Sequence, residues 1–490
     1  MLKDLRNCRR ASARGMQAAA FAGAALLGAS VPVGHAAAQT SSTLSAQDIE
    51  QLRAELKAVH QDSEAARAQE AARERQIETL QHRLDAATGV PPTAFPAQAD
   101  ASASESLPSG FKAFLSGQDG RNFEIYGFAQ TDWVQDFKRV NPAWDDTLRP
   151  SKIPTTPGQF GGDGQSVISA RQSRFGVQAQ QPIAGQDLKV KFEFDLFGVG
   201  GDEGQTTFRL RHVYGQWGPI LAGQTNSVFM DGDTFPNTVD YWGPAGMVFL
   251  RNPQIRFTHK SGKSEFAIAV EKPGNDIDPG QIRELDPALG SNIHGDEKFP
   301  DLTAHYRYDG GWGHFQFAGI LRRIGYDTAG TPDNQPKGDQ LGWGINSSAN
   351  FNVFHKDVIH LAVVYGDGIA SYMNDGGTDL GPKGAPGSLQ PEALELLGVT
   401  AYYDHAWSKK FSTSFGYSRT QVTNTSFQAA DAFNTGQYAS ANLLYTPGKN
   451  ILMGAEFLWG SRKDNNGATG DDLRLQMSFK YNFSSNDFFR

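Results

Sequence analysis

The region between residues 123 and 483 has a pattern that few folds allow. It breaks into short segments whose apolar residues recur at every second position, which is the period of a β-strand with one apolar face. Sixteen such segments follow one another. The predicted strands cover residues 123–138, 168–181, 187–198, 206–217, 219–228, 253–261, 264–272, 300–308, 312–325, 340–354, 357–366, 395–407, 410–423, 436–446, 449–463 and 470–482.

The connections between these strands alternate between short and long. Short turns include TPGKN at 446–450 and WSKKF at 407–411, whereas long connections include 139–167 and 367–394. A soluble β-sandwich has no reason to sort its loops by length. An up-and-down barrel in an outer membrane does, with short periplasmic turns, long external loops and an even number of strands. We therefore predict an all-β fold, a 16-stranded antiparallel transmembrane β-barrel with both ends in the periplasm.

The stretch LKVKFEFDLFG, residues 188–198, shows how the two faces of one strand differ. One face carries Val190, Phe192, Phe194 and Leu196, and the other carries Lys189, Lys191, Glu193 and Asp195. A charge facing lipid costs roughly 2–4 kcal/mol near the midplane. The apolar faces are therefore predicted to meet lipid tails or a neighbouring subunit, and the charged faces to line a water-filled lumen. The mean hydropathy of -0.46 excludes a bundle of transmembrane helices.

The first 38 residues have the pattern of a secretory signal peptide. Basic residues between Lys3 and Arg14 precede the apolar run MQAAAFAGAALLGASVPV, and the run of alanines that ends at Ala38 offers a cleavage site. The single cysteine, Cys8, precedes the apolar run and would leave with the signal. The mature chain is therefore expected to have no disulfide and no cysteine-ligated metal.

Residues 39–87 are predicted to form a periplasmic α-helical coiled coil. Apolar residues keep a heptad register at its two ends, at Ile49, Leu52, Leu56, Val59, Ile77, Leu80, Leu84 and Ala87. The middle of the segment is polar, so a single solvated helix is the alternative, but the exposed Ile/Leu stripe favours self-association. Residues 88–120 are rich in Pro, Ala and Ser and are predicted as a linker. Residues 121–490 are then the barrel.

Cations gather on the early strands of the predicted barrel. They are Arg174, Lys189, Lys191, Arg209, Arg211 and Arg256. Arg209 and Arg211 lie two apart in FRLRHVYGQWG and so project to one side. So much like charge in one wall is unfavourable unless water or an anion compensates it, and the arginine fork suits a carboxylate. The alternative is internal pairing with Glu193, Asp195, Glu265 or loop acids.

The segment FMDGDTFPNTVDYWGPAGMVFLRN, residues 229–252, follows the fifth predicted strand. Its length and its content of aromatic residues, Asp and Gly suit a loop that folds into the lumen and narrows it. Asp231, Asp233 and Asp240 would then face the basic wall. The spacing of these acids does not fit an EF-hand calcium loop, and we expect no metal site and no cofactor.

Several stretches together resemble the DcaP-type trimeric porins of Gram-negative outer membranes. They are SARQSRFGVQAQ (169–180), LKVKFEFDLFG (188–198), FRLRHVYGQWGPILAGQTNSVFMD (208–231) and the terminal strand, and the run RHVYGQWG…LAGQT is the most specific. The resemblance implies a homotrimer in contact with outer-membrane lipid and lipopolysaccharide. It also implies uptake of small, often dicarboxylic, anions through a basic constriction, with roles there for Arg174, Arg209, Arg211 and Arg256. The tail SSNDFFR after Phe483 departs from the usual terminal aromatic, so the last strand ends either at Phe483 or nearer Phe489.

The pattern favours a passive channel with no catalytic residue over two alternatives. One alternative is a secreted or outer-membrane hydrolase that uses Asp145, Asp146 or Asp404, but the sequence has no G-x-S-x-G, H-E-x-x-H or P-loop motif. The other is a trimeric tether or adhesin, which predicts a plugged lumen without conductance. The net charge of -8 gives no electrostatic basis for nucleic-acid binding.

Overall fold

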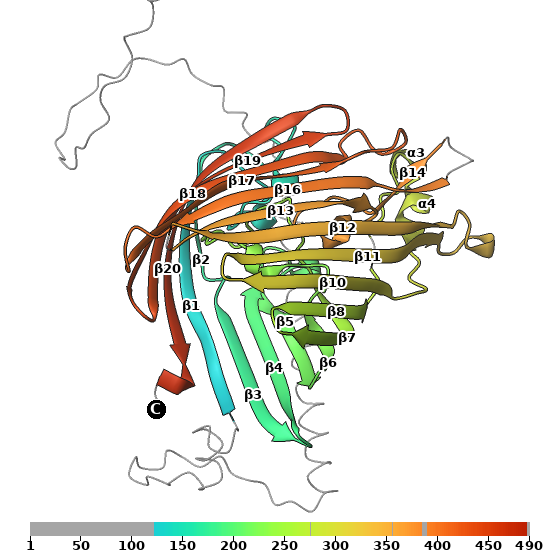
Figure 1. Ribbon diagram of the computed structural model, residues 1–490. Helices are drawn as coiled ribbons and strands as arrows, with labels where there is room; N and C mark the ends of the chain where they lie inside the picture. Colours follow the sequence, from blue (N-terminus) through green and yellow to red (C-terminus); the bar gives the residue numbers. More distant parts are fainter. Residues whose placement is uncertain (1–121, 275, 355, 385–389, 488–490) are drawn as a thin grey trace, which may run out of the picture. The chain divides into compact units, whose positions relative to one another are not determined.

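The computed structural model describes residues 122–487 except 275, 355 and 385–389 (Figure 1). The predicted signal peptide, coiled coil and linker, residues 1–120, lie outside the described residues and stay predictions. Within the described part of the chain, no helix has the length and apolarity that a membrane span requires.

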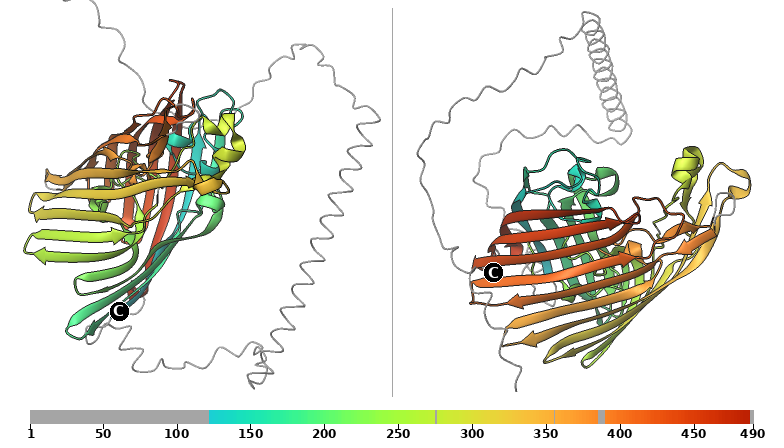
Figure 2. Two further views of the ribbon diagram at one scale, coloured as in Figure 1. Left: turned by 90° about the vertical axis from the view of Figure 1, so that its right-hand side faces the viewer. Right: turned by 90° about the horizontal axis from the view of Figure 1, so that it is seen from above.

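Sixteen strands form the wall of a closed antiparallel barrel, as predicted (Figures 1 and 2). They are β1 (Asn122–Asp136), β3 (Arg174–Ile183), β4 (Gln186–Phe197), β5 (Thr206–Trp217), β6 (Ile220–Asn226), β7 (Arg251–Ser261), β8 (Ser264–Glu271), β10 (Asp301–Gly310), β11 (Gly313–Thr328), β12 (Gly338–Val353), β13 (Asp357–Asp367), β16 (Glu395–His405), β17 (Phe411–Val422), β18 (Phe433–Gly448), β19 (Ile451–Asp464) and β20 (Thr469–Ser484). Each strand pairs with the next one along the wall. The pairing of β1 with β20 closes the ring.

Short strands, helices and most of the 3-10 turns lie in the connections at one end of the wall. The short strands β2 (Gln165–Ser169) and β9 (Ile293–Gly295) pair with β1 and β11, and β14 (Leu380–Lys383) forms a separate hairpin with β15 (Gln390–Ala393). The helices α3 (Ile282–Leu285) and α4 (Pro287–Asn292) lie beside that hairpin (Figure 1). The 3-10 turns are η2 (Pro142–Trp144), η3 (Pro150–Lys152), η4 (Gly200–Asp202), η5 (Gly232–Thr234), η6 (Pro332–Asn334), η7 (Ala370–Tyr372) and η8 (Ser485–Asp487).

The alternation of short and long connections is confirmed except at the last external loop: residues 465–468 between β19 and β20 are four, fewer than the five of the periplasmic turn 406–410. The first short turn is Ala184–Gly185, and both residues have positive φ, 52° and 76°, as in the two-residue turns that match the twist of a hairpin. The long connections gather at the opposite end, and the longest are residues 137–164, 227–250, 272–300 and 368–394. In outer-membrane barrels the long loops are external and the short turns periplasmic, which defines the two ends used below.

The apolar face of each strand points outward and the polar face points into the lumen. On β4, Phe192 is 44 % exposed, whereas Glu193 and Asp195 are 3 % and 1 % exposed. On β20, Phe479 is exposed on the outer face and Gln476 is buried on the inner face. The directions predicted from the two-residue period are therefore confirmed. The apolar side chains are exposed on the outer face, and the polar side chains that alternate with them are buried inside the barrel.

A hydrophobic core lies inside the barrel where one external loop meets the wall. We call residues 227–250 the third loop. Its Phe229 and Met230 are buried against Ile320 of β11 and Val364 of β13. The lumen is therefore filled in part by protein.

One predicted strand is split in the structure, and the end of the last strand is now defined. The segment predicted as one strand at 168–181 is split into β2 and β3, because the chain leaves the sheet at residues 170–173. Arg171 sits in that break, and its buried guanidinium pairs with Asp146 at 2.8 Å. At the other end, β20 stops at Ser484 and η8 follows, so the last strand ends beside Phe483 and does not run on toward Phe489.

Candidate functional site

The third loop begins along the wall formed by β10, β11 and β12. Asn346 donates to the carbonyl of Phe229 at 2.9 Å, and Gln316 donates to the carbonyl of Met230 at 3.1 Å. The ring of His305 lies 3.0 Å from the carbonyl of Val228. These buried side chains satisfy backbone groups that would otherwise be unpaired inside the barrel, so they fix the first part of the loop against this wall.

The loop then reaches the wall on the other side of the lumen. The Glu456 carboxylate of β19 accepts from the backbone N–H of Val239 at 3.0 Å and of Asp240 at 3.3 Å. Gln476 of β20 and Gln172 each donate to the carbonyl of Val239 at 3.1 Å. Because its two parts are anchored on different walls, the loop crosses the interior of the barrel. The expectation that this segment folds into the lumen is therefore correct.

The acids of the third loop anchor it and do not face the basic wall, so that expectation was wrong. Asp231 accepts from Ser348 at 2.6 Å and lies 2.8 Å from the ring of His314. Asp233 pairs with Arg307 of β10 at 2.7 Å. The sequence could not show that these carboxylates would pair with cations and accept hydrogen bonds from hydroxyls of the opposite wall.

The third acid, Asp240, is buried as well. Asp240 accepts from the Thr147 hydroxyl at 2.7 Å, from the Tyr438 hydroxyl at 3.0 Å and from the backbone N–H of Leu148 and Gly243, both at 3.1 Å. Burial raises the pKa of Asp240, and these hydrogen bonds offset the rise only in part. Asp240 therefore ties the third loop to the first external loop and to β18.

Four of the six predicted cations come together on β3, β4 and β5 around two carboxylates. Arg209 pairs with Asp195 at 2.7 Å, and Arg211 pairs with Asp195 at 2.8 Å and with Glu193 at 2.9 Å. The other two are Lys191, 3.3 Å from Glu193, and Arg174, 3.6 Å from Glu193. The alternative of internal pairing is therefore correct for these residues, although the cations outnumber the acids.

Two further cations, which the sequence analysis missed, complete what we call the basic cluster: Arg174, Lys191, Arg209, Arg211, Arg251 and Lys480. Arg251 lies within electrostatic reach of Arg209 and Arg211, and Lys480 of Arg174 and Arg211. The Arg251 guanidinium stacks 4.7 Å from the ring of Phe249, and the Lys480 ammonium 3.8 Å from that of Phe128. Neither forms an ion pair with any described residue. Their charges are therefore not neutralised by an ion pair within the described part of the chain.

A signal for one of these two was present in the sequence. Lys480 shares the polar face of the terminal strand with Arg474, so its inward direction could have been read from the two-residue period. Arg251 has the parity of Ile255 and Phe257, which point outward on β7. Its side chain nevertheless lies within electrostatic reach of Arg209 and Arg211, and the two-residue period does not predict this.

A β-bulge on β5 at Arg211 brings His212 onto the lumen face beside it. In the register between β4 and β5, Glu193 lies opposite His212 and Phe194 lies opposite Leu210. Arg211 is the extra residue between these pairs. Bulges of this kind redirect side chains and are common next to functional sites. As a result Arg211 and His212, which are adjacent in sequence, both lie beside Glu193.

Besides Phe249, Tyr241 of the third loop touches the basic cluster. Its hydroxyl donates to the Asp195 carboxylate and accepts from Arg211 at 3.1 Å. Its ring stacks on Phe197 with the ring centroids 4.0 Å apart. The loop is therefore held against the cluster on β4 and β5.

The other two predicted cations lie outside the cluster. Lys189 is exposed near the periplasmic turn that precedes β4. Arg256 of β7 has Glu265 and Tyr214 as its electrostatic neighbours, and its buried Nε has no hydrogen-bond partner among the described residues. Both side chains therefore stand apart from the contact between the third loop and the wall.

The acids considered for a hydrolase do not assemble. Asp146 pairs with Arg171 near the external end, and Asp145 is its neighbour in the chain. Asp404, near the periplasmic end of β16, contacts His360 at 3.1 Å and Asn237 at 2.6 Å. The described residues also contain no group of three or more His, Cys, Asp and Glu side chains placed to hold a metal ion.

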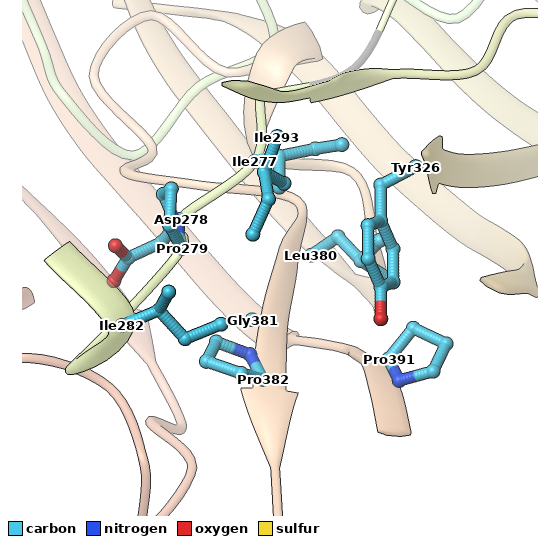
Figure 3. A pocket seen from close by; sticks show the side chains of 10 residues that line it. All are labelled: Ile277, Asp278, Pro279, Ile282, Ile293, Tyr326, Leu380, Gly381, Pro382 and Pro391. Carbon is cyan, nitrogen blue, oxygen red and sulfur yellow. The ribbon is translucent and has the colours of Figure 1, made fainter. Parts of the chain in front are cut away.

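A small pocket among the external loops is too small for a solute. It is lined mainly by apolar side chains of Ile277, Ile282, Ile293, Tyr326, Leu380 and Pro391 (Figure 3). Its free space of about 20 Å³ is enough for little more than one water molecule. The candidate site is therefore the lumen beside the basic cluster.

Comparison with known proteins agrees with this architecture. The sequence model of the DcaP outer membrane protein family matches residues 118–483. The crystal structure of the outer membrane channel DcaP of Acinetobacter baumannii superposes with a TM-score of 0.63 at 22 % identity and covers 74 % of this chain and 97 % of that one.

Two other solved structures are more distant, and no curated protein matches the chain. The anion-selective porin from Comamonas acidovorans has a TM-score of 0.49 at 11 % identity and covers 74 % of this chain and 100 % of its own. A trimer form of OmpT of Vibrio cholerae has a TM-score of 0.47 at 10 % identity and covers 74 % and 99 %. Because the family model spans most of the barrel and well over half of the sequence, the chain belongs to the DcaP outer membrane protein family and is an outer-membrane channel with a porin fold.

Proposed function

We propose that this porin conducts small hydrophilic solutes passively and favours anions. The observation that carries the proposal is the basic cluster beside the third loop. Four of its cations pair with the carboxylates Glu193 and Asp195, and the other two, Arg251 and Lys480, lie within electrostatic reach of arginines among those four. A surplus of positive charge at the narrow part of a water-filled lumen lowers the energy of a passing anion and raises that of a cation.

The arrangement of the cluster supports small dicarboxylate-like anions as the preferred solutes. Arg209 and Arg211 are largely compensated by Asp195 and Glu193. The cations without an acid partner among the described residues are Arg251, which starts β7, and Lys480, which lies on β20. Two such positions on separate strands suit a solute with two separated negative charges.

The proposal includes a homotrimer with its N-terminal coiled coil in the periplasm. The heptads of residues 39–87 support self-association. The periplasmic position follows from the strand order, because β1 starts at the periplasmic end. In this arrangement residues 1–38 are removed, residues 88–120 link the coiled coil to the barrel, and the outer face contacts outer-membrane lipid, lipopolysaccharide or a neighbouring subunit.

The test is reconstitution of the full mature protein into planar bilayers with a potassium chloride gradient. We expect discrete conductance steps and a reversal potential of the sign that marks chloride preference. We also expect malonate to reduce the chloride current more than acetate does at the same charge concentration. A silent bilayer with folded protein would support the tether alternative, and a cation-selective reversal potential would refute the role given to the basic cluster.

A further inference from the structure

A polar strip interrupts the apolar outer face of the barrel over β17, β18 and β19. Below it, toward the middle of the membrane, Tyr417 lies opposite Ala439, and Ala439 lies opposite Trp459. These side chains alternate with inward ones, so they point outward with Phe415 and Phe457. Outward Tyr and Trp form the girdles of outer-membrane barrels at the boundary between lipid tails and headgroups. This row therefore marks that boundary.

The next outward row, one step toward the external end, is polar on all three strands. Arg419 lies opposite Gln437, and Gln437 lies opposite Ser461. The Tyr417 hydroxyl donates to the side-chain oxygen Oε1 of Gln437 at 2.6 Å, and the side-chain nitrogen Nε2 of Gln437 donates to the Ser461 hydroxyl at 3.0 Å. The hydrogen bonds order this row across the strands at headgroup level.

In the third outward row, Lys463 and the guanidinium of Arg419 lie at the same level along the barrel axis. Gln421 lies opposite Thr435, which lies opposite Lys463. The Arg419 guanidinium donates to Gln421 at 2.8 Å, which draws it up from its own row toward this one. Because two strand spacings separate β17 from β19, the backbones are about 10 Å apart at this level. Both side chains are long enough to converge on one group between them.

The charges of this row differ from other outward charges near the external end. Arg323 on the outer face of β11 pairs with Asp296 at 3.3 Å and with Asp339 at 3.2 Å. Arg419 and Lys463 are exposed, and neither forms an ion pair with any described residue. Two cations at the lipid boundary without an acid partner in the described structure call for a negative group from outside the barrel.

We propose that Arg419 and Lys463 bind the phosphate of a lipid headgroup in the outer leaflet. The guanidinium fork offers two parallel donors to phosphate oxygens, and the ammonium adds a point charge. Ser461 and Gln437 supply hydroxyl and amide groups directly below, where the phosphate joins the rest of the lipid. The site faces away from the lumen, so it is separate from solute passage.

The test compares the full-length protein with the R419Q/K463Q variant in phosphatidylcholine nanodiscs. The probe is lipid A, a phosphorylated glycolipid, titrated in its phosphorylated and its dephosphorylated form, with bound lipid counted by native mass spectrometry. Loss of two charges at a membrane surface is expected to weaken binding of the phosphorylated form about thirty-fold. The matched control is K409Q/K410Q, which removes two exposed cations from the periplasmic turn before β17 and should bind as the native protein does.

Each other outcome overturns a stated part of the proposal. Equal binding of phosphorylated lipid A by R419Q/K463Q and by the native protein would show that Arg419 and Lys463 do not form the site. Equal weakening for the dephosphorylated lipid shows that phosphate is not what is recognised. Displacement by inorganic phosphate at the same concentration shows a soluble-anion site, and a changed oligomeric state in lipid-free detergent shows a surface between copies. An unchanged reversal potential of R419Q/K463Q in bilayers verifies that the barrel is folded and separates this result from a failure of the proposed channel function.

Discussion

Arg211 lies 2.8 Å from the Asp195 carboxylate although the two residues are not partners in the sheet. The register partner of Asp195 is Arg209, and the bulge on β5 brings Arg211 to the same carboxylate. One acid therefore holds two guanidinium groups side by side. Buried like charges this close are unfavourable without such a counter-charge, so Asp195 is what allows the wall to carry both arginines.

Selectivity is expected to depend most on the two cations that lack an acid partner. A unit charge about 4 Å from an ion changes its energy by about 1 kcal/mol even in bulk water. The R251Q/K480Q variant should therefore lower the anion-to-cation permeability ratio by at least about fivefold. The measurement is the reversal potential in a potassium chloride gradient.

The control for this variant is K189Q, which removes a cation outside the basic cluster. Lys189 is exposed near the periplasmic turn, so its loss should change the ratio much less. If K189Q and R251Q/K480Q shift the reversal potential equally, selectivity comes from the overall charge of the lumen and the cluster has no special role.

The position of the third loop is expected to depend on Gly246. Its N–H donates to Ser418 at 2.7 Å, and a Cβ added there would lie 2.2 Å from the carbonyl oxygen of Arg419 and 2.7 Å from that of Val399. Gly246→Ala should therefore push the loop off the β16–β17 wall and into the lumen. We expect a lower single-channel conductance.

Gly232→Ala is the matched control in the same loop. The nearest atom to its added Cβ is 3.4 Å away, at the end of the Asn226 side chain. Its conductance should stay close to that of the native channel. A G246A channel with native conductance would show that the loop is not held by this close approach.

The attachment of the third loop is expected to tighten in acid. Burial raises the pKa of Asp240 above its ordinary value, so the attached state binds this proton more tightly than the detached state does. The contribution of Asp240 to attachment is then fully present below its ordinary pKa and is lost as the pH rises through the raised value. Hydrogen exchange of residues 239–243, corrected for intrinsic rates, should show more protection as the pH falls through this range.

Asp240→Asn should flatten this pH dependence, and Asp233→Asn should leave it in place. Asp233 is in the same loop, but its side chain is 64 % exposed and pairs with Arg307. A pH dependence that persists in D240N would assign it to another group.

The wall of the barrel could be read from the sequence, but its interior could not. The period of LKVKFEFDLFG separates lipid from water, and the observed β4, 186–197, differs from the predicted strand, 187–198, by one residue at each end. Such a period is set by local geometry. The partners of Asp231 and Asp240 are set by side chains more than fifty residues away, such as His314 and Tyr438, and no local pattern encodes them.

The basic cluster shows the same division in one place. Arg209 follows the strand period and was placed correctly. Arg211 reached the lumen as expected from its parity with Arg209, but the bulge beneath it also brought His212 to Glu193. Arg251 was missed because its parity on β7 is that of the outward residues Ile255 and Phe257.

The seam between β1 and β20 has a consequence for assembly. Its register runs from Tyr126 opposite Ser484 to Asp136 opposite Arg474, and a buried ion pair of 3.0 Å between Asp136 and Arg474 fastens it. The outer edge of β1 therefore has no backbone hydrogen-bond partners until β20, the last strand of the chain, pairs with it. In a bilayer each unpaired backbone group costs several kcal/mol. A chain that ends before residue 469 lacks β20, so its insertion would leave the edge of β1 unpaired and would be strongly unfavourable. We therefore expect truncated chains to stay outside the membrane.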